Sequence, residues 1–263
     1  MSFLPQPLAA RPDALLARVA GVTRLTAGAI WLVAAVLTTD PVVPGVLCAA
    51  ALVALRLWSG LDLPTVARRF GPVFATAIGL AVLATLSGTA NATPGAAAVI
   101  EVGPVTLSGA AIAGGLALGL RLISIALTSV LVFGPGDTTG LADSLVQQWR
   151  LPDRFAYGTV AAMGLAPLLA ADWTATGAAR RLRGLEAPNL LGRLAQLGGR
   201  LMVLLVSSIR RAERMALAMD ARGFDSGSPR SRYRVVRLGL LDAVVLAVAV
   251  VVALGALLIG RAI

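Results

Sequence analysis

Two arginines, each followed directly by a glycine, are the residues of this chain best suited to specific binding chemistry. Arg183-Gly184 follows Ala179-Arg180-Arg181-Leu182, and Arg222-Gly223 follows Ala218-Met219-Asp220-Ala221. The helix dipole favours a cation on the last turn of a helix, and a following glycine lets the chain turn sharply. A guanidinium held there suits a carboxylate gripped through two parallel hydrogen bonds. The two segments therefore predict contact sites for acidic groups of a partner protein.

The residue types that are missing exclude several kinds of reactive site. Without lysine there is no G-x-x-x-x-G-K-[ST] loop, so no nucleotide site of the P-loop kind is encoded. Without histidine, zincin-type metal sites and Ser-His-Asp catalysis are excluded. The single cysteine, Cys48, lies in an apolar run and is interpreted as a small core residue. We expect no catalytic residue, no metal site and no cofactor.

The composition indicates a membrane protein. Of the 263 residues, 57% are hydrophobic and 14% are charged, and the mean hydropathy is +0.84. A soluble domain has about a quarter of its residues charged, and its apolar residues do not fall in long blocks as they do here. We therefore predict an all-α, polytopic membrane protein with about five spanning helices and a cytoplasmic domain of amphipathic helices.

Apolar blocks place the five spans at residues 25–39, 42–58, 72–90, 107–133 and 239–263. The first two are short against the roughly 20 residues that a membrane-crossing helix needs, so a re-entrant hairpin is the alternative to two short spans. The linker at 91–104 contains no arginine and is expected to be an external loop. In the fourth span Ala111, Gly115 and Gly119 recur every four residues, a spacing that lets helices approach closely.

Most arginines lie in one block, residues 134–238. It contains 15 Arg against 8 Asp and Glu, which accounts for +7 of the chain's net charge of +10. Every arginine cluster stays on the inner side if the N-terminus is inside, the C-terminus is outside and the apolar stretches at 155–171 and 197–209 do not cross. We therefore expect residues 1–133 to carry four spans and 134–238 to be cytoplasmic, with 155–171 lying along or dipping into the inner leaflet.

Two further patterns lead to expectations about arginines. An amphipathic helix before Gly223 has one apolar face, and Arg210, Arg211 and Arg214 are expected to point away from it; that face comprises Leu201, Leu204, Leu205, Ser208, Ala212, Met215 and Met219. Arg121 lies near the middle of the fourth span, where an unpaired guanidinium costs at least ~2.5–3.5 kcal/mol. It is expected to face the bundle interior and pair. Asp242 and Glu101 are possible partners, and both a substrate path and a structural pair remain open.

The sequence resembles the transmembrane T component (EcfT/CbiQ type) of energy-coupling factor transporters. These transporters are vitamin and metal importers of the ABC class. The resemblance follows the family order over about a hundred residues: Leu120-Arg121, Thr138-Thr139, Leu145, Leu151-Pro152, Ala166-Pro167, Ala179 to Gly184 and Met215 to Phe224. Met219-Asp220-Ala221-Arg222-Gly223-Phe224 is similar to the second signature of the family. The first signature usually reads Ala-Arg-Gly, and here it is Leu182-Arg183-Gly184.

The resemblance implies a scaffold that is not itself an enzyme. Two ABC-type ATPase subunits would hydrolyse ATP, and coupling helices of this chain would lie across them, with Arg183 and Arg222 seated in ATPase grooves and Gly184 and Gly223 ending the helices. A small substrate-binding membrane subunit would capture a vitamin or metal ion at a prokaryotic plasma membrane. The rivals are an ordinary ABC permease with its own substrate site, a membrane-embedded enzyme, and a lipid- or nucleic-acid-binding anchor. We expect no nucleic-acid partner.

Overall fold

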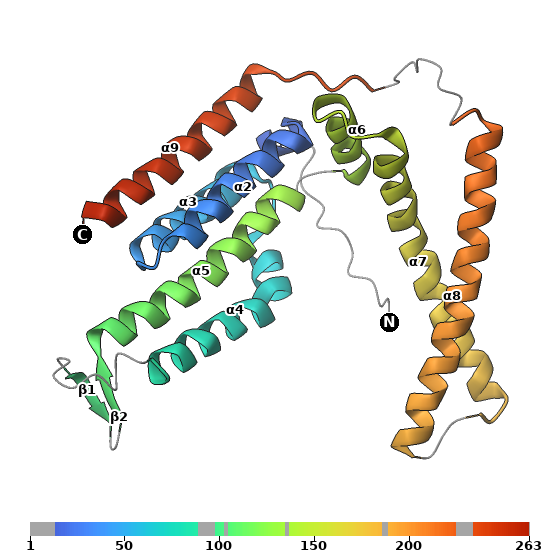
Figure 1. Cartoon of the computed structure of the whole chain (residues 1–263), viewed down its shortest axis with the longest axis horizontal. Helices are drawn as coiled ribbons and strands as arrows, with labels where there is room; N and C mark the ends of the chain where they lie inside the picture. Colours follow the sequence, from blue (N-terminus) through green and yellow to red (C-terminus); the bar gives the residue numbers. More distant parts are fainter. Residues whose placement is uncertain are drawn as a thin grey trace. The chain divides into compact units, whose positions relative to one another are not determined.

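The computed structural model describes residues 14–88, 98–102, 105–134, 137–185, 189–224 and 234–262 (Figure 1). Its helices are α1 (Leu15–Arg18), α2 (Gly21–Leu37), α3 (Val42–Trp58), α4 (Leu63–Leu86), α5 (Gly109–Phe133), α6 (Thr138–Gln148), α7 (Asp153–Leu182), α8 (Leu190–Ala221) and α9 (Leu240–Ala262). The described residues form two compact units. The bundle unit lies within Pro7–Leu151 and Val236–Ile263, and the hairpin unit lies within Pro152–Val235.

The helices confirm the predicted all-α membrane class. By length and composition, α4, α5, α7 and α9 are able to cross a membrane, and α2 and α3 are shorter apolar helices. With 17 residues each, α2 and α3 are about 26 Å long, a little less than a hydrocarbon core of about 30 Å. The bundle core is built from small and branched side chains, and among its most deeply buried members are Ala35, Val43, Leu47, Ala51 and Leu55.

Small residues let α4 and α5 pack closely, as the four-residue spacing predicts. A Cβ atom added at Gly115 would collide with Oγ1 of Thr85 and lie 2.6 Å from the carbonyl oxygen of Ala81. One added at Gly119 would lie 2.8 Å from Cβ of Ala81. Both glycines are therefore required by the approach of the two helices rather than by their backbone conformation.

The helices α2 and α9 run parallel and begin side by side. At their beginnings the amide of Ala20 donates a hydrogen bond of 2.8 Å to the Asp242 carboxylate. Further along, the Trp31 indole N–H donates one of 3.0 Å to the Ala249 carbonyl. Because both contacts occur in the same order along the two helices, α2 and α9 start at the same face of the bundle.

The direction of α5 is opposite to that of α2. Near the beginning of α2, a Cβ at Gly28 would meet Val132, which lies near the end of α5. At the other end of α2, the Thr38 carbonyl accepts a hydrogen bond from Arg121, in the middle of α5. The end of α5 and the beginning of α9 therefore share one face, and the chain between them leaves that face and returns to it. An even number of crossings by the arginine-rich block, including none, satisfies this geometry.

Three boundaries differ from the sequence-based expectations. The third span was expected at 72–90, but α4 begins at Leu63, since Asp62 and Pro64 form a favourable start and Pro72 is accommodated inside the helix. The linker expected to be a loop contains a strand, β1 (Ala98–Val102), which pairs antiparallel with β2 (Val105–Ser108) between the linker and α5.

The third difference concerns the beginning of the arginine-rich domain, which was expected at residue 134. Helix α6 packs against α2, where the Val22 amide donates to the Ser144 hydroxyl at 3.2 Å. A Cβ at Gly21 would collide with Leu141 and Ser144 of α6. The compact hairpin unit therefore begins at Pro152, and residues up to Leu151 belong with the bundle.

Candidate functional site

The two arginine–glycine pairs lie at the ends of α7 and α8, which pack together as an antiparallel helical hairpin. Near one end of the hairpin, Tyr157 of α7 meets Phe224 edge-to-face, with ring centroids 6.4 Å apart. Near the other end, the Gln196 side chain of α8 donates to the carbonyl of Leu185, 2.5 Å away. The end of α7 therefore lies near the beginning of α8, and the end of α8 lies near the beginning of α7.

The end of α7 is a Schellman motif built around Gly184. This glycine has φ of +69°, in the left-handed region that disfavours side chains with a Cβ. Its amide donates to the Arg181 carbonyl at 3.0 Å, and the amide of Leu185 donates to the Arg180 carbonyl at 3.1 Å. These two bonds are the pair that defines the motif. Arg183 occupies the C-cap position, and its side chain is exposed.

The end of α8 repeats the same geometry around Gly223, which has φ of +74°. Its amide donates to the Asp220 carbonyl at 2.9 Å, and the amide of Phe224 donates to the Met219 carbonyl at 3.1 Å. Arg222 is the C-cap residue and is exposed. The structure thus places both sequence-predicted arginines at equivalent positions of two equivalent helix ends, each followed by a glycine that requires a positive φ.

The two ends lie far apart on the hairpin. Tyr157, which contacts Phe224 beside the second arginine, is 26 residues before Arg183. At a helical rise of about 1.5 Å per residue this separation is ~40 Å. No hydrogen bond or ion pair joins either guanidinium to another residue in the part of the chain that the structure describes. Each arginine is therefore available to a partner. Because the two arginines are so far apart, one small acidic site cannot bind both.

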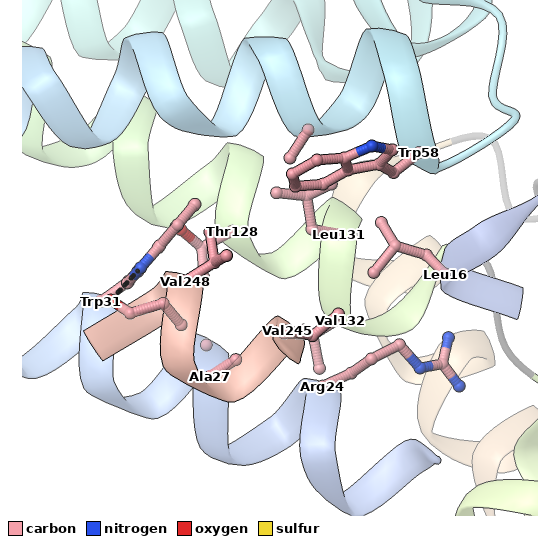
Figure 2. A pocket seen from close by; sticks show the side chains of 13 residues that line it. Leu16, Arg24, Ala27, Trp31, Trp58, Thr128, Leu131, Val132, Val245 and Val248 are labelled. Carbon is pink, nitrogen blue, oxygen red and sulfur yellow. Dashed lines mark hydrogen bonds between the residues drawn. The ribbon is translucent and has the colours of Figure 1, made fainter. Parts of the chain in front are cut away.

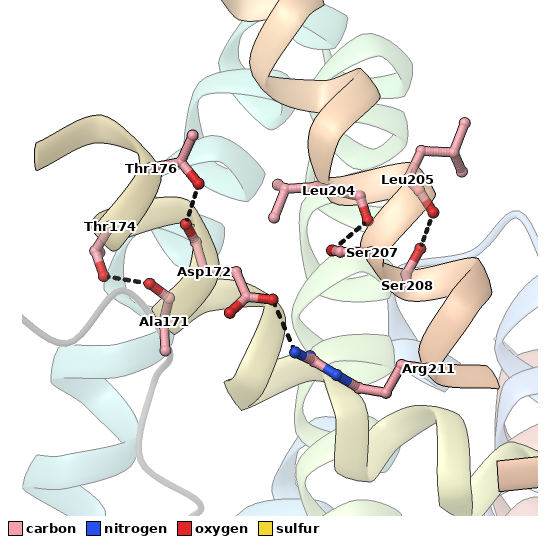
Figure 3. Close-up of polar contacts among 9 residues, drawn as sticks. All are labelled: Ala171, Asp172, Thr174, Thr176, Leu204, Leu205, Ser207, Ser208 and Arg211. Carbon is pink, nitrogen blue, oxygen red and sulfur yellow. Dashed lines mark hydrogen bonds and ion pairs between the residues drawn. The ribbon is translucent and has the colours of Figure 1, made fainter. Parts of the chain in front are cut away.

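Polar contacts between the middles of α7 and α8 hold the hairpin, and we call them the clasp: Asp172, Trp173, Arg200 and Arg211. Arg211 reaches across to the Asp172 carboxylate with an N–O distance of 3.0 Å (Figure 3). The guanidinium of Arg200 lies over the Trp173 ring, 3.7 Å from its centroid, and donates to the Trp173 carbonyl at 2.7 Å. Gly177 leaves room for it, since a Cβ there would lie 2.7 Å from the guanidinium.

The clasp corrects the expectation that Arg211 points away from the helix interface. Arg211 is partly buried on the same side of α8 as Leu204, Ser208, Met215 and Met219. Apolar periodicity assigns a face by its hydrophobic residues and therefore misses an arginine paired across the interface. The available signal was Asp172, the one acidic residue in the interior of an otherwise apolar helix, but its partner is 39 positions away in the sequence.

Arg121 is not paired with Asp242, one of the two partners suggested by the sequence. Its guanidinium donates to the Thr38 carbonyl at the end of α2, so a backbone oxygen takes the place of a carboxylate. Asp242 is occupied elsewhere, since its two oxygens accept the amides of Ala20 and Gly239, each at 2.8 Å. The side chain of Glu101 lies outside the described residues. Within them Arg121 acts as a tie between α5 and the end of α2, which favours the structural interpretation.

Among the described residues, no group of three His, Cys, Asp or Glu side chains is arranged to hold a metal ion. The chemistry available at the two helix ends is therefore that of fixed, exposed cations. Guanidinium groups in this setting bind carboxylates.

The family model and the related proteins that match this chain all point to the same family. The family described as cobalt transport protein, CbiQ, matches residues 14–235, which include most of the bundle and both helices of the hairpin. The energy-coupling factor transporter transmembrane protein EcfT of Bacillus selenitireducens is 28% identical over 245 residues, covering 90% of this chain and 89% of that protein. Proteins of the same name from Streptococcus equi and Staphylococcus aureus are each 27% identical, over 172 and 171 residues, which is 62% of this chain in both cases. The chain is therefore a membrane protein that belongs to the CbiQ family of cobalt transport proteins.

Proposed function

We propose that this chain is the transmembrane component of an energy-coupling factor transporter, and that Arg183 and Arg222 each bind one of two ATPase subunits. The observation that supports this most strongly is the repetition of one Schellman motif, with an exposed C-cap arginine, at opposite ends of the α7–α8 hairpin. Two equivalent cations ~40 Å apart suit two related subunits better than one. The names of the related proteins support the same role.

In this proposal the hairpin transmits motion and does no chemistry of its own. Each guanidinium grips a carboxylate in a groove of an ATPase, and the glycine behind it fixes the direction in which the helix ends. When the ATPases close around nucleotide, they move both ends of the hairpin. The clasp keeps α7 and α8 together, so the motion reaches a small substrate-binding membrane subunit, which releases a vitamin or a metal ion on the inner side.

The arginine-rich block is cytoplasmic in this proposal. The parallel packing of α2 and α9 supports an even number of crossings between α5 and α9. If α7 crossed, α8 would have to cross back, but α8 carries arginines along its length and is not among the helices apolar enough to span. We therefore keep five spans, with α7 lying at the inner leaflet.

Purification of the tagged full chain from a cell that expresses the neighbouring genes tests the proposal. Two ATPase subunits and a small hydrophobic membrane protein should be recovered with it, and the chain alone should neither bind nor hydrolyse ATP. Saturable ATP binding by the chain alone would contradict the division of roles. Substrate uptake that needs no separate capture subunit would favour an ordinary permease.

A further inference from the structure

A cavity inside the bundle unit is bordered by a deeply buried arginine that lacks a partner. The cavity has a volume of about 70 Å³ and lies between α2, α3, α5 and α9 (Figure 2). Its walls are almost entirely apolar, and Trp31, Trp58, Leu131 and Val245 are among the residues that form them. Arg24, on the first turn of α2, is the one charged residue of the lining. Figure 2 shows its side chain starting beside Val132 and Val245 and extending away from Trp31 and Thr128.

No described residue forms an ion pair with Arg24. The residue is only 6% exposed, and its Nε and Nη1 atoms are buried with no hydrogen-bond partner in the described part of the chain. Asp242, at the adjacent start of α9, uses both carboxylate oxygens to accept the amides of Ala20 and Gly239. Burial of the Nε and Nη1 groups without acceptors is unfavourable, because these two groups have lost water and gained no anion.

The surrounding helices add to the need for an anion. The starts of α2 and α9 lie side by side and parallel, as the bond from Ala20 to Asp242 requires. Each helix start carries a partial positive charge from its unpaired amides, so a cation at this position is unfavourable. The Asp242 carboxylate accepts amides at both helix starts, from Ala20 and from Gly239. The site therefore has an excess of positive charge beside an apolar cavity.

We propose that Arg24 binds the phosphate group of a membrane phospholipid, and that the carbon atoms next to this headgroup fill the apolar cavity. The phosphate supplies acceptors for the unpaired N–H groups, and charge-assisted bonds of this kind are among the stronger ones in proteins. The apolar walls of the cavity offer water molecules few hydrogen-bond partners. A short stretch of hydrocarbon suits these walls better. Arg24 lies at the end of the bundle where α2 and α9 begin. This position corresponds to the depth of lipid headgroups in a membrane.

Lipid-dependent stability of the purified full chain tests the assignment. In detergent, added phosphatidylglycerol should raise the Tm of the wild type saturably. Phosphatidylcholine should raise it much less, because its headgroup brings a cation to a site that is already positive, and inorganic phosphate should do so because it has no hydrocarbon. Arg24→Met keeps an unbranched apolar stem but removes the charged guanidinium, and it should increase the half-saturating phosphatidylglycerol concentration by about tenfold or more. Because it also removes a buried unpaired charge, the variant should be at least as stable as the wild type without lipid.

A matched control distinguishes a site from general attraction to an anionic surface. Arg68, exposed on α4, has the same charge, and Arg68→Met should leave the response to phosphatidylglycerol unchanged. Native mass spectrometry should find phospholipid retained by the wild type and by Arg68→Met, and lost from Arg24→Met. An equal lipid response in the wild type and Arg24→Met would overturn the proposal. A shift of similar size with inorganic phosphate alone would show a free-anion site and would overturn the assignment to lipid.

Discussion

At the level of single residues, the position of each arginine proposed to bind an ATPase depends on the glycine behind it. The C-cap arginine projects from the helix end only if the next residue adopts a positive φ, and Gly184 and Gly223 do so with φ of +69° and +74°. The amide of that glycine closes one of the two Schellman bonds. A substitution that disturbs the turn would therefore misdirect the guanidinium even though the arginine itself is intact.

Gly223→Ala should consequently destabilise the end of α8 by about 1 kcal/mol, because alanine resists the left-handed region. It should also weaken ATPase binding. The control is Gly158→Ala in the interior of α7, where nothing lies within 4 Å of the added Cβ and the change should stabilise by roughly 0.5–1 kcal/mol. Thermal unfolding of the two variants in detergent measures the difference. Equal shifts for both would show that the positive φ at Gly223 has no energetic consequence.

The residue-scale predictions succeeded where the chemistry is local. An arginine, a glycine and a following apolar residue describe a helix end within three positions, so Arg183 and Arg222 were placed correctly at exposed C-caps from the sequence. The partners of Arg121 and Arg211 were not predicted, because they come from other helices. A hydrogen bond from Arg121 to a backbone carbonyl 83 residues away has no sequence signal.

At the scale of elements, the clasp decides whether the hairpin behaves as one body. Asp172 and Arg211 are partly exposed, with 36% and 28% of their side chains accessible, so their pair should contribute only about 0.5–1 kcal/mol. The Asp172–Arg211 pair acts mainly on the alignment of the hairpin, because a pair between opposite charges favours one register of α7 against α8. Asp172→Asn and Arg211→Gln should each weaken the coupling of ATP hydrolysis to uptake.

The exchange Asp172→Arg with Arg211→Asp should restore part of that coupling, since the charges again face each other. The measurement is transport per ATP hydrolysed for both single variants and the double variant. A double variant no better than the worse single variant would mean that Asp172 and Arg211 act independently.

The contact between α4 and α5 allows a sharper test of packing, because Gly114 and Gly115 are neighbours with opposite surroundings. Gly115→Val would force side-chain atoms against Thr85 and Ala81 and should destabilise the bundle by ~1–3 kcal/mol. At Gly114 nothing lies within 4 Å, so Gly114→Val should have a much smaller effect. Thermal unfolding of the two full-length variants compares them. Similar losses at both positions would contradict the close approach of the helices.

Most elements were predictable because long apolar blocks leave few alternatives to helices. The predicted span at 42–58 coincides with α3, and those at 25–39, 107–133 and 239–263 differ from α2, α5 and α9 by a few residues at either end. The start of α4 was missed because Arg68-Arg69 and Pro72 look like a boundary, whereas an exposed arginine and a proline are both tolerated in a long helix. The pairing of β1 with β2 depends on contacts across a turn, which composition alone does not reveal.

At the scale of the whole molecule, the topology predicts which residues water reaches from outside. In a Cys48→Ser background, a cysteine at Ser87 lies at the end of α4, opposite the face where α2 and α9 begin, and should react with an impermeant thiol reagent in intact cells. A cysteine at Gly184 or Gly158 should be shielded until the cells are permeabilised. Labelling at Gly184 from outside would overturn the cytoplasmic assignment of the hairpin unit.

If each end of the hairpin binds one ATPase subunit, the number of ATPase subunits in the purified complex depends on both arginines. Native mass spectrometry measures this number directly. The wild type should retain two ATPase subunits, and Arg183→Ala or Arg222→Ala should each lose one, since removing one member of a buried charge pair costs ~2–5 kcal/mol. Arg222→Lys should recover binding only in part, because an ammonium does not reproduce the planar fork of a guanidinium. Arg210→Ala removes an exposed arginine of the same helix and should retain both subunits. Retention of both ATPases by the double variant Arg183→Ala/Arg222→Ala, with the stability of the wild-type complex, would contradict the account.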